Sequence, residues 1–175
     1  MQDVIEGRVW TLGRDVDTDQ IISGKYLTII DPNELRKHVF EIALPEFAKG
    51  AKSGDIIVAD ENFGSGSSRE HAPQAMRAIG VGAVVADSFA RIFFRNAINL
   101  GIPTIEAPGV RANFEMGDPA RIEMRSGRVV NLRTGRTVEF PPLPPHLLEL
   151  LDAGGLVEKV RRELEAQKAR GGSRA

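Results

Sequence analysis

The chain has 175 residues, of which 42% are hydrophobic and 27% are charged, proportions that suit one ordinary globular domain with its own core. Its 23 Lys and Arg residues nearly balance its 24 Asp and Glu residues, and this argues against a nucleic-acid partner. Cysteine is absent, which excludes disulfides, thiolate nucleophiles and any cysteine-ligated iron–sulfur or zinc site within this chain.

The first part of the chain predicts a strand and then a helix. MQDVIEGRVW contains no apolar signal core, and no apolar stretch of the chain is long enough to cross a bilayer. We therefore expect a cytoplasmic protein with no membrane partner. Residues 8–12, RVWTL, predict the first strand. Residues 32–48 carry apolar side chains at helical spacing, and we predict a helix there that is bent or broken near Pro45.

Two short runs rich in β-branched residues predict buried strands. They are IIVAD at residues 56–60 and AVVAD at residues 83–87, with the continuous apolar pattern of strands that are covered on both faces. Residues 72–80 have helical spacing and lie between the two runs. The three segments therefore predict a parallel βαβ unit.

The next part of the chain predicts a further helix and strand and then an antiparallel unit. Residues 88–101 predict a helix that ends on a glycine, and residues 102–108 predict a strand. Residues 121–124 and 128–140 alternate in polarity around a turn at Thr134-Gly135. This alternation indicates an antiparallel β-hairpin annexe.

The C-terminal part begins with PPLPP, which stops the strand pattern. Residues 146–167 then form an amphipathic segment. We find no internal repeat and no second domain. The predicted organisation is a single domain at residues 1–168, followed by a disordered tail at residues 169–175.

Three alternating aspartates are spaced as in a calcium-binding loop. They are Asp15, Asp17 and Asp19, but Gln20 stands where such a loop needs glycine and Tyr26 stands where it needs a bidentate glutamate. We therefore interpret the stretch as a turn rich in aspartate. We predict no metal site in this chain, since its three histidines also lack metal-ligand spacing. These histidines are His38, His71 and His146.

The stretch GSGSSREH at residues 64–71 lies between a predicted strand and a predicted helix, and it admits two interpretations. In the structural one, Ser67 and Glu70 form a capping box that starts the helix. In the functional one, the turn presents backbone N–H groups and a helix dipole to an anion, and Arg69 adds a fork for a carboxylate. The Walker A and dinucleotide-binding patterns are absent, so the functional interpretation favours a small acid.

Three motifs in one order carry a resemblance to a known family. They are DVDTDQIISGKYL, the long segment ENFGSGSSREHAPQAMRAIGVGAVVADSFARIFFRNAINLGIP, and LLDAGGLV. The chain resembles the small subunit of the isopropylmalate isomerase and homoaconitase family, two-chain relatives of aconitase, over residues 7–157. The resemblance implies an α/β fold, the aconitase-type swivelling β/β/α domain, with a mixed, largely parallel sheet and a C-terminal antiparallel hairpin. It also implies a hydro-lyase that dehydrates and rehydrates a small di- or tricarboxylic hydroxy acid.

The resemblance implies roles for individual residues of this chain. Ser67 matches the general base, and Ser68 and Arg69 match residues that bind a substrate carboxylate. Asp19 matches an aspartate near the active site. The chemistry agrees, because removing a proton next to a carboxylate builds negative charge that a cation and N–H groups stabilise. We expect Glu70 and His71 to support the residues that touch the substrate.

The resemblance also implies a cofactor outside this chain. In the family, an iron–sulfur cluster removes hydroxide as a Lewis acid, and a chain without cysteine lacks the ligands for it. We therefore expect no cofactor on this chain and an iron–sulfur cluster in a large partner subunit. The assembly is expected to be a heterodimer or a heterotetramer.

The segment after TDQII is implied to sort substrates. We place Lys25, Tyr26 and Leu27 near the site and Thr28 against the substrate. Relatives that act on an acid with an extra carboxylate tend to carry arginine after Tyr-Leu, and a buried carboxylate needs such a cation. Thr28 and Ile29 suit a branched alkyl arm better.

We therefore predict isomerisation of 2-isopropylmalate to 3-isopropylmalate, a step of leucine biosynthesis. A homoaconitase subunit of lysine biosynthesis and an alkylmalate or citramalate hydro-lyase are alternatives within the family. A stand-alone enzyme, a non-catalytic carboxylate-binding module and a purely structural subunit remain open from other classes.

Overall fold

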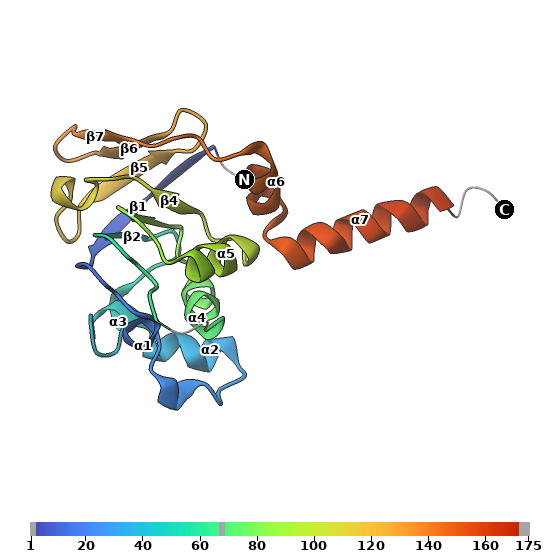
Figure 1. The fold of residues 1–175 in the computed structure, drawn as a ribbon, viewed down its shortest axis with the longest axis horizontal. Coiled ribbons are helices and arrows are strands. Elements are labelled where there is room, and N and C mark those ends of the chain that lie inside the picture. Colours follow the sequence, from blue (N-terminus) through green and yellow to red (C-terminus); the bar gives the residue numbers. More distant parts are fainter. Residues whose placement is uncertain (1–2, 67–68, 172–175) are drawn as a thin grey trace.

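A computed structural model describes residues 3–66 and 69–171 of the chain. In this part of the chain the strands form one seven-stranded sheet in the order β4-β3-β2-β1-β5-β6-β7 (Figure 1). The strands are β1 (Val4–Thr11), β2 (Ile56–Ala59), β3 (Ala83–Ala86), β4 (Thr104–Glu106), β5 (Pro119–Glu123), β6 (Arg128–Asn131) and β7 (Thr137–Glu139).

Strand β1 joins a parallel half of the sheet to an antiparallel half. Its last residues pair with β2 in parallel, with Val9 opposite Ile56, while its first residues pair with β5 in antiparallel, with Val4 opposite Glu123. The pairs β2–β3 and β3–β4 are parallel, and β5–β6 and β6–β7 are antiparallel. The mixed sheet with C-terminal antiparallel strands is confirmed. The predicted hairpin annexe is part of this same sheet.

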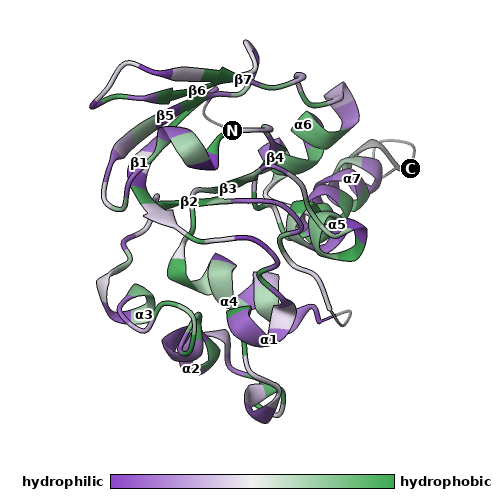
Figure 2. Ribbon diagram, turned by 60° about the vertical axis from the view of Figure 1, so that its left-hand side comes forward, coloured by the Kyte–Doolittle hydropathy of each residue, from purple (hydrophilic) through white to green (hydrophobic). Residues whose placement is uncertain are grey.

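Both faces of the parallel strands are covered, as their continuous apolar pattern predicts. Trp10, Ile57 and Val84 belong to one buried cluster, and their neighbours Val9 and Ile56 belong to another, because successive side chains of a strand point to opposite faces. Helices α1–α4 lie on one side of β2 and β3, and α6 lies on the other side (Figure 2). The helices are α1 (Thr18–Ile21), α2 (Pro32–Leu35), α3 (Phe47–Gly50), α4 (His71–Ile79), α5 (Arg91–Asn99), α6 (Pro145–Ala153) and α7 (Leu156–Gly171), with 3-10 turns η1 (Gly24–Tyr26), η2 (Arg36–His38) and η3 (Arg111–Asn113).

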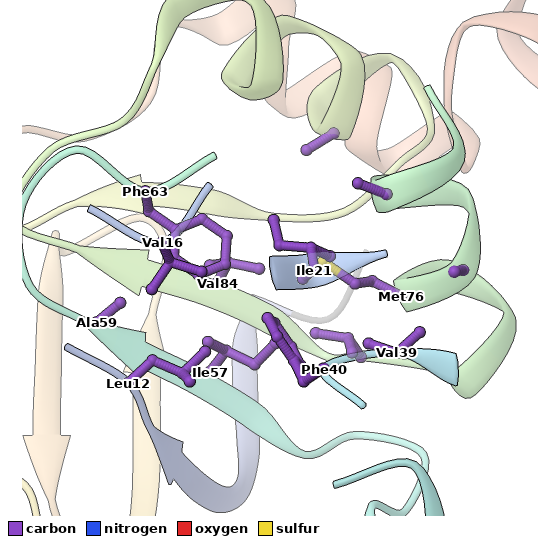
Figure 3. Close-up of a cluster of buried hydrophobic side chains, with 14 of the residues drawn as sticks. Leu12, Val16, Ile21, Val39, Phe40, Ile57, Ala59, Phe63, Met76 and Val84 are labelled. Carbon is purple, nitrogen blue, oxygen red and sulfur yellow. The ribbon is translucent and has the colours of Figure 1, made fainter. Parts of the chain in front are cut away.

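The predicted helix at residues 32–48 is wrong as a single element. The chain forms the short helix α2, the turn η2 and then α3, and Pro45 is not the cause of the first break. Val39 is extended, and Phe40 has a φ of 54°, in the left-handed region. The side chain of Phe40 is fully buried, and its N–H donates to the carbonyl of Ile21 over 2.9 Å. Figure 3 shows Phe40 beside Ile57 of strand β2. Core packing therefore overrides the local helical pattern.

Helix α5 begins three residues later than residues 88–101 predict. The backbone at Phe89 forms a parallel bridge with Phe63. Phe63 donates to the carbonyl of Ser88 over 3.1 Å, and Ala90 donates to the carbonyl of Phe63 over 2.9 Å. These hydrogen bonds hold residues 88–90 extended beside the loop that follows β2.

The C-terminal amphipathic segment is two helices. Gly154 and Gly155 have φ values of 87° and 112° and separate α6 from α7, which extends away from the rest of the molecule (Figure 1). Helix α7 runs to Gly171, and residues 172–175 lie outside the described residues, so the domain boundary at residue 168 stays a prediction. Within residues 3–66 and 69–171, no helix is both long and apolar enough to span a membrane.

Candidate active site

Two loops meet at the carboxyl end of the parallel strands. The loop after β1 and the loop after β2 run side by side, with a parallel bridge between Asp17 and Ser65. Thr18 donates to the carbonyl of Ser65 over 2.8 Å, and Gly64 donates to the carbonyl of Val16 over 2.7 Å. This edge is where ligands bind in open α/β sheets. The GSGSSREH motif therefore starts at a position suited to a binding site.

Two glycines shape the turn that leads into the serines. Gly64 has a φ of 79°, and a Cβ atom there would lie 2.2 Å from the ring of Phe93. Gly66 has a φ of 91°, and a Cβ atom there would lie 3.3 Å from the hydroxyl of Thr18. Both positions therefore favour glycine for its left-handed backbone, and Gly64 also because no side chain fits.

Ser67 and Ser68 lie outside the described residues, so their roles stay predictions. The capping box proposed for this motif is wrong, because α4 begins at His71 and Glu70 is its N-cap rather than its third residue. Glu70 is exposed and caps no N–H group with its side chain. A capping box is present at α1 instead, where Asp17 and Gln20 each accept a hydrogen bond from the other's backbone N–H, over 2.7 and 3.0 Å.

Arg69 is held by Asp19 across the junction of the two loops. Nη1 of Arg69 donates to Oδ1 of Asp19 and lies 3.5 Å from the carbonyl oxygen of Ile22. The backbone N–H of Gly24 donates to the same Oδ1 over 3.1 Å. The side chain of Arg69 is 19% exposed, whereas that of Asp19 is 61% exposed. The guanidinium is thus partly buried and fixed by one of its nitrogens.

The electrostatics of this pair favour its charged form. The hydrogen bond from Arg69 lowers the pKa of Asp19 below its ordinary 3.8, and the N–H of Gly24 adds to this effect. Hydrogen bonds to an ionised carboxylate lower its pKa because they stabilise the charge. Asp19 is therefore a carboxylate at neutral pH, and it keeps Arg69 in place.

The three aspartates point to three different partners. Asp15 accepts a hydrogen bond from Nδ2 of Asn62 over 2.8 Å, and Asp15 and Asn62 both have a left-handed backbone. Asp17 caps α1, and Asp19 binds Arg69. Only Asp17 makes the local hydrogen bond expected of a turn rich in aspartate, because Asp15 and Asp19 bind residues far away in the sequence. In the part of the chain that the structure covers, no three His, Cys, Asp or Glu residues are grouped to hold a metal.

Lys25 and Tyr26 face each other and Glu41. The Tyr26 hydroxyl donates to Oε2 of Glu41, and Nζ of Lys25 lies 3.5 Å from the same atom. The ring of Tyr26 is stacked on that of His38 at 3.7 Å. Both residues follow directly after Gly24, which touches the Asp19–Arg69 pair. Lys25 and Tyr26 are therefore near the site because they follow Gly24 in the chain, and their side chains contact Glu41 instead of the Asp19–Arg69 pair.

Of the predicted site residues Leu27, Thr28 and His71, His71 lines a cavity. Leu27 is half-buried and Thr28 is exposed. His71, at the first position of α4, lines a surface cavity of about 670 Å³ together with Ile29 and Ile30. Thr28 does not line this cavity, so its contact with a substrate stays a prediction.

Known proteins resemble this chain over the residues of the candidate site. Residues 43–109, which include the GSGSSREH turn, match the family model for the aconitase C-terminal domain. The chain is 56% identical to the 3-isopropylmalate dehydratase small subunit 1 of Methanopyrus kandleri, over 93% of this chain and 96% of that protein. It is 44% identical to the isopropylmalate/citramalate isomerase small subunit of Methanocaldococcus jannaschii, over 94% and 98%.

The chain belongs to the family of 3-isopropylmalate dehydratase small subunits. A solved member of this family, the 3-isopropylmalate dehydratase LeuD of Methanocaldococcus jannaschii, superposes with a TM-score of 0.90 at 41% identity. The match covers 95% of this chain and 99% of that one. The resemblance and the fold predicted from the motifs are thus confirmed.

The sequence motifs did not identify three residues of this chain that contact candidate site residues. Gly24 supports Asp19 through its N–H, Asn62 binds Asp15, and Glu41 binds Tyr26. The pattern Asp-x-x-Gln was a readable signal for the cap at Asp17. No local signal identifies Asn62 or Glu41, because their partners lie 47 and 15 residues away in the sequence.

Proposed function

We propose that this chain is the small subunit of a 3-isopropylmalate dehydratase, a hydro-lyase, and that it supplies the general base and a carboxylate clamp. The observation that carries the proposal is the fixed guanidinium of Arg69 at the end of the glycine turn. Only Nη1 of Arg69 is used by a residue that the structure describes. Nη2 and Nε therefore form a fork suited to one carboxylate.

The chemistry assigned to this chain is proton transfer beside a carboxylate. Ser67 removes a proton from the carbon next to the carboxylate that Ser68 and Arg69 bind, and it returns a proton on rehydration. Negative charge grows on that carboxylate as the proton leaves, and a fixed cation stabilises it more in the transition state than in the ground state. Asp19 keeps the cation from turning away.

A large subunit completes the proposed enzyme. The names of the relatives contain the words "small subunit", which imply a larger partner chain. The iron–sulfur cluster expected from the family does not fit this chain, which has no cysteine and, among its described residues, no grouped metal ligands. We place the cluster in the large subunit, where it would act as a Lewis acid, and no residue of this chain is assigned to it.

The substrate we propose is isopropylmalate. The ammonium group of Lys25 is paired with Glu41, so the one cation of the segment KYLTII is already occupied. Thr28 and Ile29, which follow Tyr26 and Leu27, suit an alkyl arm better than a third carboxylate. Citramalate, which carries a smaller alkyl arm, is the second candidate, because one relative is named an isopropylmalate/citramalate isomerase subunit.

The test is Ser67→Ala in the complex reconstituted with a large subunit. We expect kcat to fall by about 10²–10⁴-fold, the scale for loss of a positioned general base, with little change in KM. Ser65→Ala is the matched control, since Ser65 takes part in the turn through its backbone. A Ser67→Ala complex with full kcat and only a lower thermal midpoint would indicate a structural serine or a non-catalytic binding module.

A further inference from the structure

The segment that follows Gly24 has few backbone anchors of its own. The N–H of Leu27 donates to the carbonyl of Gly24 over 3.3 Å, and the N–H of Ile29 donates to the carbonyl of Tyr26 over 3.0 Å. The next fixed point is Asp31, whose side chain caps α2. The path of residues 27–30 therefore depends on where Gly24 and Tyr26 are held.

Gly24 is held at the candidate site itself. Its N–H binds Asp19, and its Cα faces the guanidinium of Arg69, since a Cβ atom added there would lie 3.5 Å from Nη1 and from Nη2. Residues 27–30 thus begin beside the proposed carboxylate clamp. Their conformation therefore affects which substrates can bind to the carboxylate clamp at Arg69.

Tyr26 is held by three side chains from two separate stretches of the chain. Glu41 accepts a hydrogen bond from the Tyr26 hydroxyl, and Nζ of Lys25 lies 3.5 Å from the same carboxylate. His38 stacks on the Tyr26 ring at 3.7 Å with an interplanar angle of 16°, and its Nδ1 lies 3.8 Å from Oε2 of Glu41. Lys25 also lies over the Tyr26 ring, 4.7 Å from its centre.

The cluster is stronger than a set of isolated surface pairs. Single exposed ion pairs contribute little, but here every member contacts at least two others, so fixing one side chain lowers the entropy cost of fixing the next. The hydrogen bond from Tyr26 lowers the pKa of Glu41, and Lys25 adds to this effect. Tyr26 and Ile29 also pack against the main core cluster.

We propose that Lys25, Tyr26, His38 and Glu41 form a clamp that fixes residues 27–30 beside the Asp19–Arg69 pair and so sets selectivity for the substrate's variable arm. The four are positioning residues, because they act on the substrate only through the segment that they hold. This inference rests on the proposed function for its kinetic consequence. Its structural part is independent of catalysis.

The structural part is tested by hydrogen exchange on the full chain. Glu41→Gln keeps the side-chain size but removes the charge that Lys25 and Tyr26 share. Exchange at the N–H groups of Leu27 and Ile29 should rise by about tenfold, as expected when local opening becomes easier. Glu34→Gln is the matched control, because it removes a neighbouring surface pair with Lys37 at 2.7 Å and leaves the cluster intact. Equal exchange rates in the two variants would overturn the proposal that the four side chains fix residues 27–30.

The kinetic part is tested in the reconstituted complex with isopropylmalate and citramalate. Glu41→Gln should raise KM for isopropylmalate by about tenfold while kcat changes little, because the segment is misplaced and the base is not. The ratio of kcat/KM for isopropylmalate to kcat/KM for citramalate should fall by a similar factor. Tyr26→Phe, which keeps the stacked ring, should show a smaller effect. Faster exchange with unchanged KM and preference would overturn the role in selectivity, and it would leave the Ser67→Ala result untouched.

Discussion

Arg69 has a fixed position because of a residue 50 places earlier in the chain. Asp19 binds one nitrogen of the guanidinium, and Gly24 orients Asp19. The pKa of Asp19 is lowered from its ordinary 3.8, so Asp19 stays ionised, and keeps its pair with Arg69, to a pH below that ordinary value. An arginine is suited to this position because one nitrogen of the guanidinium can be anchored while the others stay able to bind the proposed substrate carboxylate.

Arg69→Lys tests this division of the fork. A lysine ammonium that pairs with Asp19 has no second pair of N–H groups in a fixed plane to bind a carboxylate. We therefore expect KM of the reconstituted enzyme to rise by about 10–100-fold, the factor for one lost charge-assisted hydrogen bond. Steady-state kinetics on isopropylmalate measure this change. Arg125→Lys, which alters an exposed pair with Asp3, should leave KM unchanged. Equal KM values in both variants would contradict a substrate contact at Arg69.

A largely buried polar network links the antiparallel strands to one another. Asp118 accepts hydrogen bonds from Asn131 Nδ2 over 2.7 Å and from the N–H of Glu115 over 2.9 Å, and it is paired with Arg133. Its side chain is 5% exposed. Asn131, which is fully buried, also accepts from the N–H groups of Arg133 and Thr134. The network therefore joins the start of β5 to the β6–β7 turn.

Asp118→Asn should destabilise the protein in a pH-dependent manner. Arg133, with the other hydrogen bonds, lowers the pKa of Asp118 from 3.8 to about 2, so its stabilising effect is full above the ordinary carboxyl range and is lost as the pH falls toward 2. We expect the variant to lose about 1–3 kcal/mol of unfolding free energy at neutral pH, with a smaller loss at pH near 3. Urea unfolding at several pH values measures this difference.

The control for the network is Asp3→Asn, which affects the exposed pair with Arg125. Exposed pairs of this kind contribute at most about 1 kcal/mol. A loss of unfolding free energy in Asp118→Asn that is no larger than in Asp3→Asn, or that is constant with pH, would contradict a stabilising role of the network between β5 and the β6–β7 turn.

At the scale of the whole molecule, the chain belongs to a family of small subunits, a name that implies a larger partner chain. Arg69 and the glycine turn before the serines lie beside the loop that follows β1, and the chain has no cysteine for an iron–sulfur cluster. The purified chain should therefore be colourless and inactive. Adding an iron–sulfur large subunit should produce hydro-lyase activity with a preference for isopropylmalate over homoaconitate, measured by unsaturated-acid absorbance. Turnover or an iron–sulfur absorption band in the isolated chain would contradict this division.

The sequence by itself determined the elements whose signals are local. The β-branched runs at residues 56–60 and 83–87 became β2 and β3, and the turn at Thr134-Gly135 became the β6–β7 connection. The motif GSGSSREH marked the family because its glycines and charged residues occur at fixed spacing. Such signals are readable because periodicity and turn chemistry act between residues close in sequence.

Only the tertiary structure decided the features that depend on distant partners. Residues 32–48 have helical spacing, but burial of Phe40 against strand β2 breaks them into short turns. The predicted annexe joined the main sheet because β1 offers a free edge to β5. Asp19 became the partner of Arg69, and Glu41 the partner of Tyr26, because the fold brings their loops together. No local pattern encodes these contacts, since each requires the whole core to form first.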